Sequence, residues 1–221
     1  MIPVSYPLQK DTPLYPGTVG LSITPFKSIS NGDSSNSSIF SFCSHSTTHV
    51  DVPRHFCQEG SSVSDLLHAE MVYFPSYCLD IPKENDECIE ADDFKTVPER
   101  KSDAKALLIK TGFARYRDVS RDRYINRHPW VHPDLPRFLR EHFPRLELIG
   151  FDILSVSVPA HRQEGRQCHR AFLCDAPPVF IIEDADLSDS RLLNECLVLR
   201  IFPWILEDID GVPVSAFAEE E

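Results

Sequence analysis

Short apolar runs alternate with polar and turn-forming stretches along most of the chain. Five runs have the length and aliphatic character of buried strands: Tyr77–Ile81, Lys105–Gly112, Leu146–Leu154, Val179–Asp184 and Cys196–Phe202. Two other segments have apolar residues at helical spacing: Val63–Phe74, with Ser64 as a plausible N-cap, and His132–Phe143. The pattern predicts an α/β domain with a mixed β-sheet and flanking helices, without the strict βαβ rhythm of a doubly wound fold.

The first forty residues follow a different pattern. Met1–Pro25 is interrupted by prolines and a glycine, which favours turns and short edge strands over a long helix. The strand candidates Leu21–Ile29 and Ile39–Cys43 flank a polar stretch, Ser30–Ser38, whose Asn-Gly pair is a turn signal. We therefore expect a hairpin there. A second irregular region, Ser155–Cys174, begins as a predicted loop.

Length and charge limit the kinds of partner that the protein can have. The 221 residues, 42% hydrophobic and 25% charged, predict one globular domain spanning residues 1–221. The formal net charge of -12, from 34 acidic and 22 basic residues, repels polyanions, so it excludes nucleic acid and anionic membranes as the expected partners. A small-molecule substrate is the expectation.

The cysteines and the N-terminal segment suggest a location. Seven cysteines are scattered without a Cys-x-x-Cys pair, and their odd number leaves at least one thiol free of any intramolecular disulfide. A reducing compartment is the simpler interpretation. The first residues lack the basic and apolar regions of a signal peptide, and no apolar run approaches the ~20 residues that a membrane span needs. We expect a cytoplasmic protein.

Candidate chemistry concentrates in the stretch HSTTHVDVPRH, residues His45–His55, with three imidazoles and a carboxylate. Its β-branched residues and proline favour an extended chain beyond His49. Because side chains alternate along a strand, His49 and Asp51 point one way and the valines beside them the other. The four-residue spacing of His45 and His49 brings their side chains together in either a helix or a strand.

This set of side chains fits a divalent metal. Imidazole nitrogens and carboxylate oxygens suit zinc, manganese or iron, and a site without thiolate favours catalysis over a structural zinc finger. The alternative is that the histidines are ordinary surface or hydrogen-bonded core residues, because a His-x-x-x-His pair also occurs by chance. Asp51 and His55 favour the metal site, since burying these polar groups unpaired would be costly.

The stretch also resembles a known family, the cyclase-like metal hydrolases that include bacterial kynurenine formamidase and isatin hydrolase. Their signature is His-x-Gly-Thr-His-x-Asp-x-Pro-x-His. This chain matches it at His45, Thr48, His49, Asp51, Pro53 and His55. Thr47 replaces the glycine, so it must either adopt an ordinary dihedral or bear strain there. The resemblance continues at Asp11–Gly17, Leu107–Gly112, Leu148–Val156, His169–Leu173 and Val179–Leu187.

The resemblance implies the roles of individual residues. The ligands that it implies for one metal are His45, His49, Asp51 and Glu183, and those for a second are Asp51, Glu183 and His169. His161 competes with His169 for the distal position, although the apolar residues after His169 fit the family better. His55 would be the proton shuttle and Tyr15 would contact substrate. Without the resemblance, Glu183 is a charge at a strand end and Tyr15 a turn-flanking tyrosine.

The function implied is metal-dependent hydrolysis of a C–N amide bond, with an aryl formamide such as N-formylkynurenine as the first substrate. Two alternatives stay open: opening of a cyclic amide or lactone, as in isatin hydrolase, and a non-catalytic metal-binding relative. One or two zinc or manganese ions, a homodimer and a swivelling β/β/α-type fold are also implied. Trp130 and Trp204 could lie at a dimer interface, but we expect them to fill the core.

Overall fold

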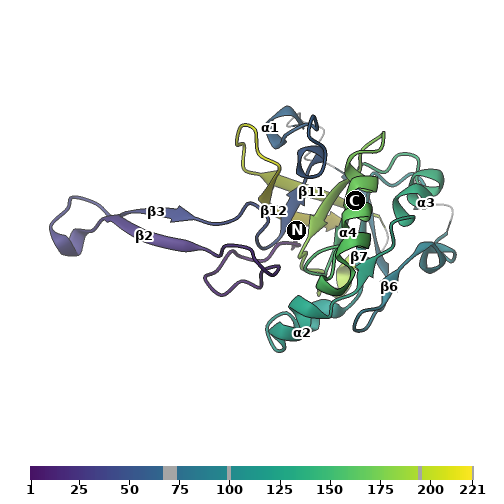
Figure 1. The fold of residues 1–221 in the computed structure, drawn as a ribbon, viewed down its shortest axis with the longest axis horizontal. Coiled ribbons are helices and arrows are strands. Elements are labelled where there is room, and N and C mark those ends of the chain that lie inside the picture. The colour runs from purple at the N-terminus through teal and green to yellow at the C-terminus, as the bar shows by residue number, and fades with distance from the viewer. Residues whose placement is uncertain (67–73, 99–100, 194–195, 221) are drawn as a thin grey trace.

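The main structural feature is one mixed β-sheet that closes on itself (Figure 1). The computed structural model describes residues 1–66, 74–98, 101–193 and 196–220. The strands of this sheet are β1 (Ile2–Pro3), β4 (His49–Asp51), β5 (Phe74–Asp80), β7 (Ala106–Lys110), β9 (Leu148–Phe151), β10 (Phe180–Glu183), β11 (Leu197–Pro203) and β12 (Gly211–Glu220). Their order is β1-β12-β11-β5-β7-β9-β10-β4, and β12 also pairs with β4. The seven strands from β12 to β4 therefore form a closed barrel.

The direction of the strands changes around the barrel. β5, β7, β9 and β10 run parallel to one another. β4, β12 and β11 join them through antiparallel pairs. The parallel strands are covered on both faces, which explains their uninterrupted apolar sequences. The predicted α/β class with a mixed sheet is confirmed, as are the five predicted strands with shifted ends. Closure into a barrel was not predicted, and the swivelling arrangement stays a prediction.

Two hydrophobic cores lie on opposite faces of this sheet. One face, with Leu108 and Ile182, fills the barrel interior. The other face, with Ile109 and Ile181, packs under the helices. These helices are α2 (Arg121–Asn126), α3 (Leu135–His142) and α4 (Arg162–Leu173). Gly150 of β9 faces inward, where a Cβ would lie 2.8 Å from a Leu108 methyl carbon. The outer face of the sheet is therefore the one that the helices cover. Side chains and helices on this face can enclose a site.

Short elements connect these layers. They are η1 (Ile29–Asn31), η2 (Pro53–His55), α1 (Val63–Leu66), β6 (Cys88–Ile89), η4 (Ala91–Phe94), η6 (Phe113–Tyr116), β8 (Trp130–Val131), η7 (Pro159–His161) and η8 (Ser190–Leu193). β6 and β8 form a separate parallel pair. No helix in the described ranges is long and apolar enough to cross a membrane. The cytoplasmic location stays a prediction.

The predicted hairpin is confirmed and projects from the barrel as an arm (Figure 1). The arm consists of β2 (Ser22–Lys27) and β3 (Ser37–Ser41), and Gly32 at its tip has a φ of 93°. Most of its side chains are exposed, including large apolar ones. At its base, Phe40 and Phe42 each lie 5.9 Å from the Trp204 ring, edge to face. Trp204 is 48% exposed, so its predicted place in the core is wrong.

The structure adds detail to two segments of the sequence prediction. Of the helix expected over Val63–Phe74, the structure describes α1 (Val63–Leu66), and it makes Phe74 the first residue of β5; residues 67–73 lie outside the described residues. The segment Ser155–Cys174, predicted as a loop only at its start, continues into the helix α4. Gly165 lies inside α4, where a Cβ would lie 2.1 Å from the Ser157 hydroxyl oxygen. This glycine, which lowers helix propensity, is required by close packing.

The closing strand β12 has no counterpart in the sequence prediction. Its buried residues nevertheless alternate along Val212, Val214, Ala216 and Ala218, which is the period-two pattern of a strand with one face inside the barrel. The small alanines weaken this signal because they are also strong helix formers.

Candidate metal centre and its cavity

The strand β4 has the alternation that its sequence predicted. Val50 and Val52 pack in the barrel interior, so His49 and Asp51 face the other side. β10 pairs antiparallel with β4 in a register that places Glu183 opposite His49. The prediction that the early His/Asp cluster adjoins Glu183 therefore agrees with the backbone pairing.

The side chains expected to bind metal converge in space. The His45 Nδ1 lies 2.8 Å from an Asp51 carboxylate oxygen, and the His49 Nε2 lies 3.3 Å from the same oxygen. Glu183 lies 3.6 Å from the His49 Nε2 and 3.2 Å from the His169 Nε2. The His169 Nε2 is also 3.6 Å from Asp51. Three imidazoles thus surround two carboxylates, and residues 124 positions apart take part.

The hydrogen bonds of two histidines select their tautomers. The His49 Nδ1 donates to the Thr47 carbonyl oxygen over 2.8 Å, and the His169 Nδ1 donates to the Gly165 carbonyl oxygen over 2.7 Å. A carbonyl only accepts, so the proton must be on Nδ1. The Nε2 atoms that face the carboxylates are therefore free to offer lone pairs. This arrangement, with one ring nitrogen held by the protein, is typical of metal-binding histidines.

Two atoms at the centre of the cluster lack partners. The His49 Nε2 and one Asp51 carboxylate oxygen are buried and have no hydrogen-bond partner among the described residues. Buried polar atoms are rarely left unpaired, so such atoms call for an explanation. A cation among these donors would satisfy both atoms. Ligand atoms of His45, His49 and Asp51 lie within 4.8 Å of one another, as a shared ion requires.

The electrostatics of the cluster also favour a cation. Burial opposes ionisation of Asp51, but the charges of His45 and His55 hold the pKa of Asp51 well below its usual value. Burial likewise opposes a charge on His45, but the carboxylates of Asp51 and Asp210 outweigh it and raise the pKa of His45 to about 11. The two buried carboxylates thus need positive charge, which either imidazolium protons or a divalent metal could supply.

A hydrogen-bonded support holds Glu183 in place. One of its carboxylate oxygens accepts from the Ser155 hydroxyl over 2.9 Å and from the Val156 backbone N–H over 2.8 Å. The other oxygen is the one that faces His49. Sequence analysis missed Ser155, because a serine in a polar loop gives no signal of its partner.

Of the two competing histidines, only His169 lies in the cluster. The His161 ring stacks on Trp130 with a centroid distance of 4.2 Å, and its Nδ1 lies 3.9 Å from Glu164. Gly165, one turn before His169 on α4, supplies the carbonyl that orients the His169 ring. The helix therefore delivers the distal histidine in a fixed orientation.

His55 lies at the edge of the cluster beside an acid that sequence analysis missed. The His55 ring stacks on His45 with a centroid distance of 3.9 Å. One carboxylate oxygen of Asp210, just before β12, lies 3.2 Å from the His55 Nδ1 and 2.8 Å from the His45 Nε2. Nothing in the sequence near Asp210 indicates this contact, which barrel closure produces. His55 also lies within 4.8 Å of ligand atoms of Asp51 and His169, so its position also permits metal binding.

Thr47 adopts the left-handed backbone that the family glycine would permit. Its φ is 55°, which is unfavourable for a β-branched residue. The Thr47 hydroxyl donates to the Tyr6 carbonyl oxygen over 3.0 Å. Of the two conformations expected for Thr47, the strained one is therefore present. The hydrogen bond to the N-terminal segment offsets part of the free-energy cost of this strain.

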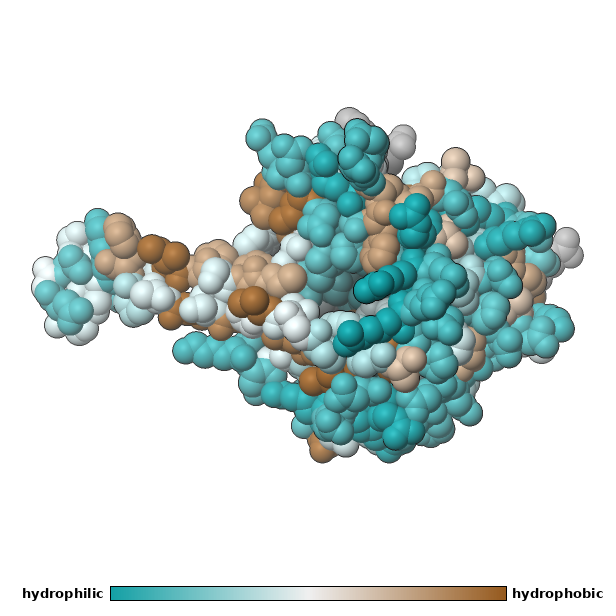
Figure 2. All heavy atoms as spheres, in the orientation of Figure 1, coloured by the Kyte–Doolittle hydropathy of each residue, from teal (hydrophilic) through white to brown (hydrophobic). Residues whose placement is uncertain are grey.

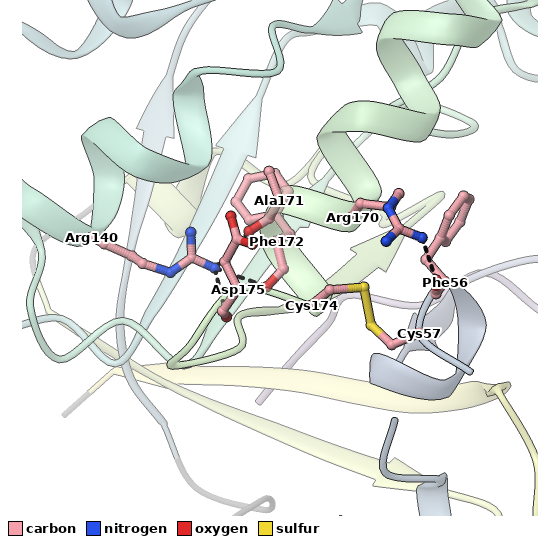
Figure 3. Close-up of a disulfide and its surroundings, with 8 residues drawn as sticks. All are labelled: Phe56, Cys57, Arg140, Arg170, Ala171, Phe172, Cys174 and Asp175. Atoms are coloured by element: carbon pink, nitrogen blue, oxygen red, sulfur yellow. Dashed lines mark hydrogen bonds between the residues drawn. A yellow bond between two sulfur atoms is a disulfide. The ribbon is translucent and has the colours of Figure 1, made fainter. Parts of the chain in front are cut away.

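A disulfide joins the two segments that carry His55 and His169. Cys57, which follows η2, is bonded to Cys174 at the end of α4 (Figure 3). The Arg170 guanidinium beside it donates to the Phe56 carbonyl oxygen over 3.0 Å. The predicted reduced state is thus wrong for this pair, while Cys43, Cys78, Cys88 and Cys168 are free thiols. The crosslink could not be read from spacing, because 117 residues separate the two cysteines.

A cavity of about 380 Å³ opens over the cluster. Tyr15, His49, His55 and His169 line it, and the Tyr15 hydroxyl lies 3.5 Å from the Ser157 hydroxyl. Figure 2, which shows the side of α4, has a hollow with strongly hydrophilic side chains beside it. Four of the five predicted metal ligands, the shuttle and the substrate contact therefore border one space that is large enough for a small molecule, and Asp51 is buried behind it.

Comparison with known proteins identifies the family to which this chain belongs. The family described as "Putative cyclase" matches residues 2–158, which is more than half of the chain. The chain belongs to this family, and the resemblance inferred from the motif is confirmed.

Individual relatives agree with the family match. Kynurenine formamidase of Bacillus mycoides is 27% identical over 215 residues, covering 97% of this chain and 95% of that protein. The enzyme of the same name from Geobacillus thermodenitrificans is 27% identical over 221 residues. The fold is that of isatin hydrolase A from Labrenzia aggregata, with a TM-score of 0.76 at 20% identity over 98% of this chain and 92% of the other. A potential metal-dependent hydrolase with cyclase activity matches with a TM-score of 0.74 at 21% identity, over 99% and 97%.

Metal binding is expected to stabilise the protein through Asp51. Chelator-treated protein supplied with zinc or manganese should melt about 5–10 °C higher, because a ligand that binds only the native state stabilises it by mass action. The variant Asp51→Asn should lose this shift and most of the bound metal, whereas Asp134→Asn, at an exposed position, should keep both. Thermal melts and metal analysis check this, and an unchanged metal content in Asp51→Asn would contradict it.

Replacing Thr47 by valine should destabilise the protein by about 1–2 kcal/mol. Valine keeps the β-branched shape and the backbone strain but removes the hydroxyl, so the Tyr6 carbonyl loses its partner. Urea unfolding measures the change. Thr96→Val, at an exposed position, should shift the free energy of unfolding by less than about 0.5 kcal/mol. Equal stability of Thr47→Val and the natural protein would show that the hydrogen bond contributes nothing.

Proposed function

We propose that this protein is a metal-dependent hydrolase of C–N amide bonds, with aryl formamides such as N-formylkynurenine as its first substrates. The observation that carries the proposal is the convergence of three imidazoles on two buried carboxylates at the floor of a cavity. The ligand set that we propose is the one that the family resemblance implies: His45, His49, Asp51 and Glu183 for one ion, and Asp51, Glu183 and His169 for a second. Zinc and manganese both accept such donors.

The metal and the protein would divide the chemistry between them. A divalent cation here supplies Lewis acidity for the amide carbonyl and lowers the pKa of an attacking water. His55 takes the proton of that water and returns it to the departing nitrogen, since it borders the cavity and carries a free ring nitrogen when its Nδ1 donates to Asp210. Tyr15 forms part of the wall against which an aryl group would pack.

Asp210 would act as a positioning residue in this scheme. Burial opposes its charge, but hydrogen bonds from His45 and His55 keep the pKa of Asp210 below its usual value. The ionised carboxylate accepts from the His55 Nδ1 and so fixes the orientation of the ring, as carboxylates behind catalytic histidines do. The same oxygen holds the outer nitrogen of His45, so it links the shuttle to a proposed metal ligand.

The test is turnover by metal-loaded protein on formanilide, N-formylkynurenine, isatin and a simple lactone. His55→Ala should lower kcat by at least about 100-fold with metal content unchanged, and Asp210→Asn should lower it by about 10-fold. His142→Ala, at an exposed site on α3, should match the natural protein. Preference for isatin or the lactone would favour the ring-opening alternative. Bound metal without turnover of any compound would overturn the hydrolase and favour the non-catalytic relative.

We also propose that the protein is a homodimer formed through the β2–β3 arm. A two-stranded ribbon has little stability alone, and this one exposes 66% of Phe26 and 59% of Ile39. The exposed Trp204 and Ile205 continue the apolar surface at its base. A second copy of the chain would bury these side chains.

Sedimentation analysis checks the dimer. The natural protein should sediment as a dimer at micromolar concentration, and Phe26→Glu combined with Ile39→Lys should sediment as a monomer, because charges in an apolar interface are costly to bury. Val119→Glu introduces a charge at a position that is 81% exposed and should not change the mass. A monomeric natural protein would contradict the proposal.

A further inference from the structure

One face of α4 joins the metal cluster to two arginines. Arg162, Arg166 and His169 are spaced by four and three residues, so they follow one another along the same side of the helix. All three line the cavity. With a rise of about 1.5 Å per residue, the backbone positions of the arginines lie about 4–11 Å along the helix from His169. The cavity therefore has a metal end and an arginine end.

These arginines have no acidic partner in the described part of the chain, where no ion pair joins either side chain to a carboxylate. Other arginines are paired: Arg117 with Asp184, Arg123 with Glu84 and Arg200 with Glu219. Both arginines are exposed at the cavity and lie one helical turn apart, so two positive charges are close together there. Mutual repulsion between them would be relieved by an anion.

The residues around Arg162 and Arg166 form one wall of the cavity. The Arg162 guanidinium lies 5.9 Å from the centre of the Tyr15 ring, which faces it from the N-terminal segment. Among the described side chains that line the cavity, Glu183 is the only acidic one, and it belongs to the metal cluster. Arg170, one turn beyond Arg166, is engaged with the Phe56 carbonyl instead. The arginine end thus presents donors and no competing carboxylate.

We propose that Arg162 and Arg166 form a carboxylate-binding subsite, so that the substrate is an aryl amide with a carboxylate on a side chain. This inference rests on the hydrolase function proposed above and specifies its substrate class. The planar guanidinium fork matches a carboxylate with two parallel hydrogen bonds. The aryl group would lie between the two ends, against Tyr15, Leu154 and Phe56. Because helical side chains lean toward the N-terminus, the carboxylate lies several bonds from the amide and not directly beside it.

The experiment compares three formamides on metal-loaded protein: N-formylkynurenine, its methyl ester and unsubstituted formanilide. The acid should exceed the ester in kcat/KM by about 10-fold or more, because charge-assisted hydrogen bonds are stronger than neutral ones. Arg162→Ala with Arg166→Ala should abolish this preference by raising KM for the acid. The same variant should lose much less on formanilide, which has no carboxylate, than on the acid, and a thermal melt like that of the natural protein shows that it is folded. The preference should weaken with added salt.

Two further variants sharpen the result. Arg162→Lys with Arg166→Lys keeps the charge but loses the fork, so it should retain only part of the preference. Arg137→Ala removes an exposed arginine of α3 that pairs with Glu141, and it should leave all three substrates unchanged. Equal kcat/KM for the acid and the ester, or equal losses on all three substrates in the double alanine variant, would overturn the subsite while leaving the hydrolase intact.

A binding measurement separates failure of the subsite from failure of the hydrolase. If no formamide is hydrolysed, calorimetric binding of kynurenine and of its methyl ester to metal-loaded protein still tests the arginines. Tighter binding of the acid by about 10-fold, lost in the double alanine variant, would support the subsite without the proposed reaction. Equal binding of acid and ester, or of neither, would overturn it.

Discussion

The site depends on the antiparallel pairing of β4 with β10, which brings Asp51 and Glu183 together on the outer face of the barrel. Two buried carboxylates repel each other and lose hydration, so the arrangement is stable only with positive charge between or around them. His45, His49 and His169 occupy the positions from which that charge or its ligands can come. The carbonyls of Thr47 and Gly165 then determine which ring nitrogen faces the carboxylates.

Barrel closure and helix packing build the surroundings of this pair. β12 pairs with the free side of β4 and carries Asp210 to the outer nitrogens of His45 and His55. On the other side, α4 is held near η2 by the Cys57–Cys174 disulfide (Figure 3). The helix that orients His169 is therefore tied covalently to the segment of His55, and the same helix carries the two arginines of the cavity wall.

The replacement of the family glycine by Thr47 is accommodated by local hydrogen bonds. Thr47 adopts the left-handed backbone despite its β-branched side chain, and its hydroxyl holds the Tyr6 carbonyl. The next residue, Thr48, accepts from the Tyr6 N–H and donates to the Asp184 carbonyl. The N-terminal segment that leads to Tyr15 is thus fastened to the metal loop, so a change at Thr47 would affect both the loop and one wall of the cavity.

The sequence alone determined the elements whose signal is local. Period-two alternation in HVDV set the facing of His49 and Asp51, continuous apolar runs indicated the parallel strands, and the spacing of His45 to His55 indicated the family. Only the tertiary structure decided the rest. Strand register placed Glu183, barrel closure placed Asp210, and packing around Gly165 made α4 a helix that delivers His169 and the arginines. These contacts join residues far apart in the chain, and their energy comes from burial and pairing in the folded state, which no local pattern of residues encodes.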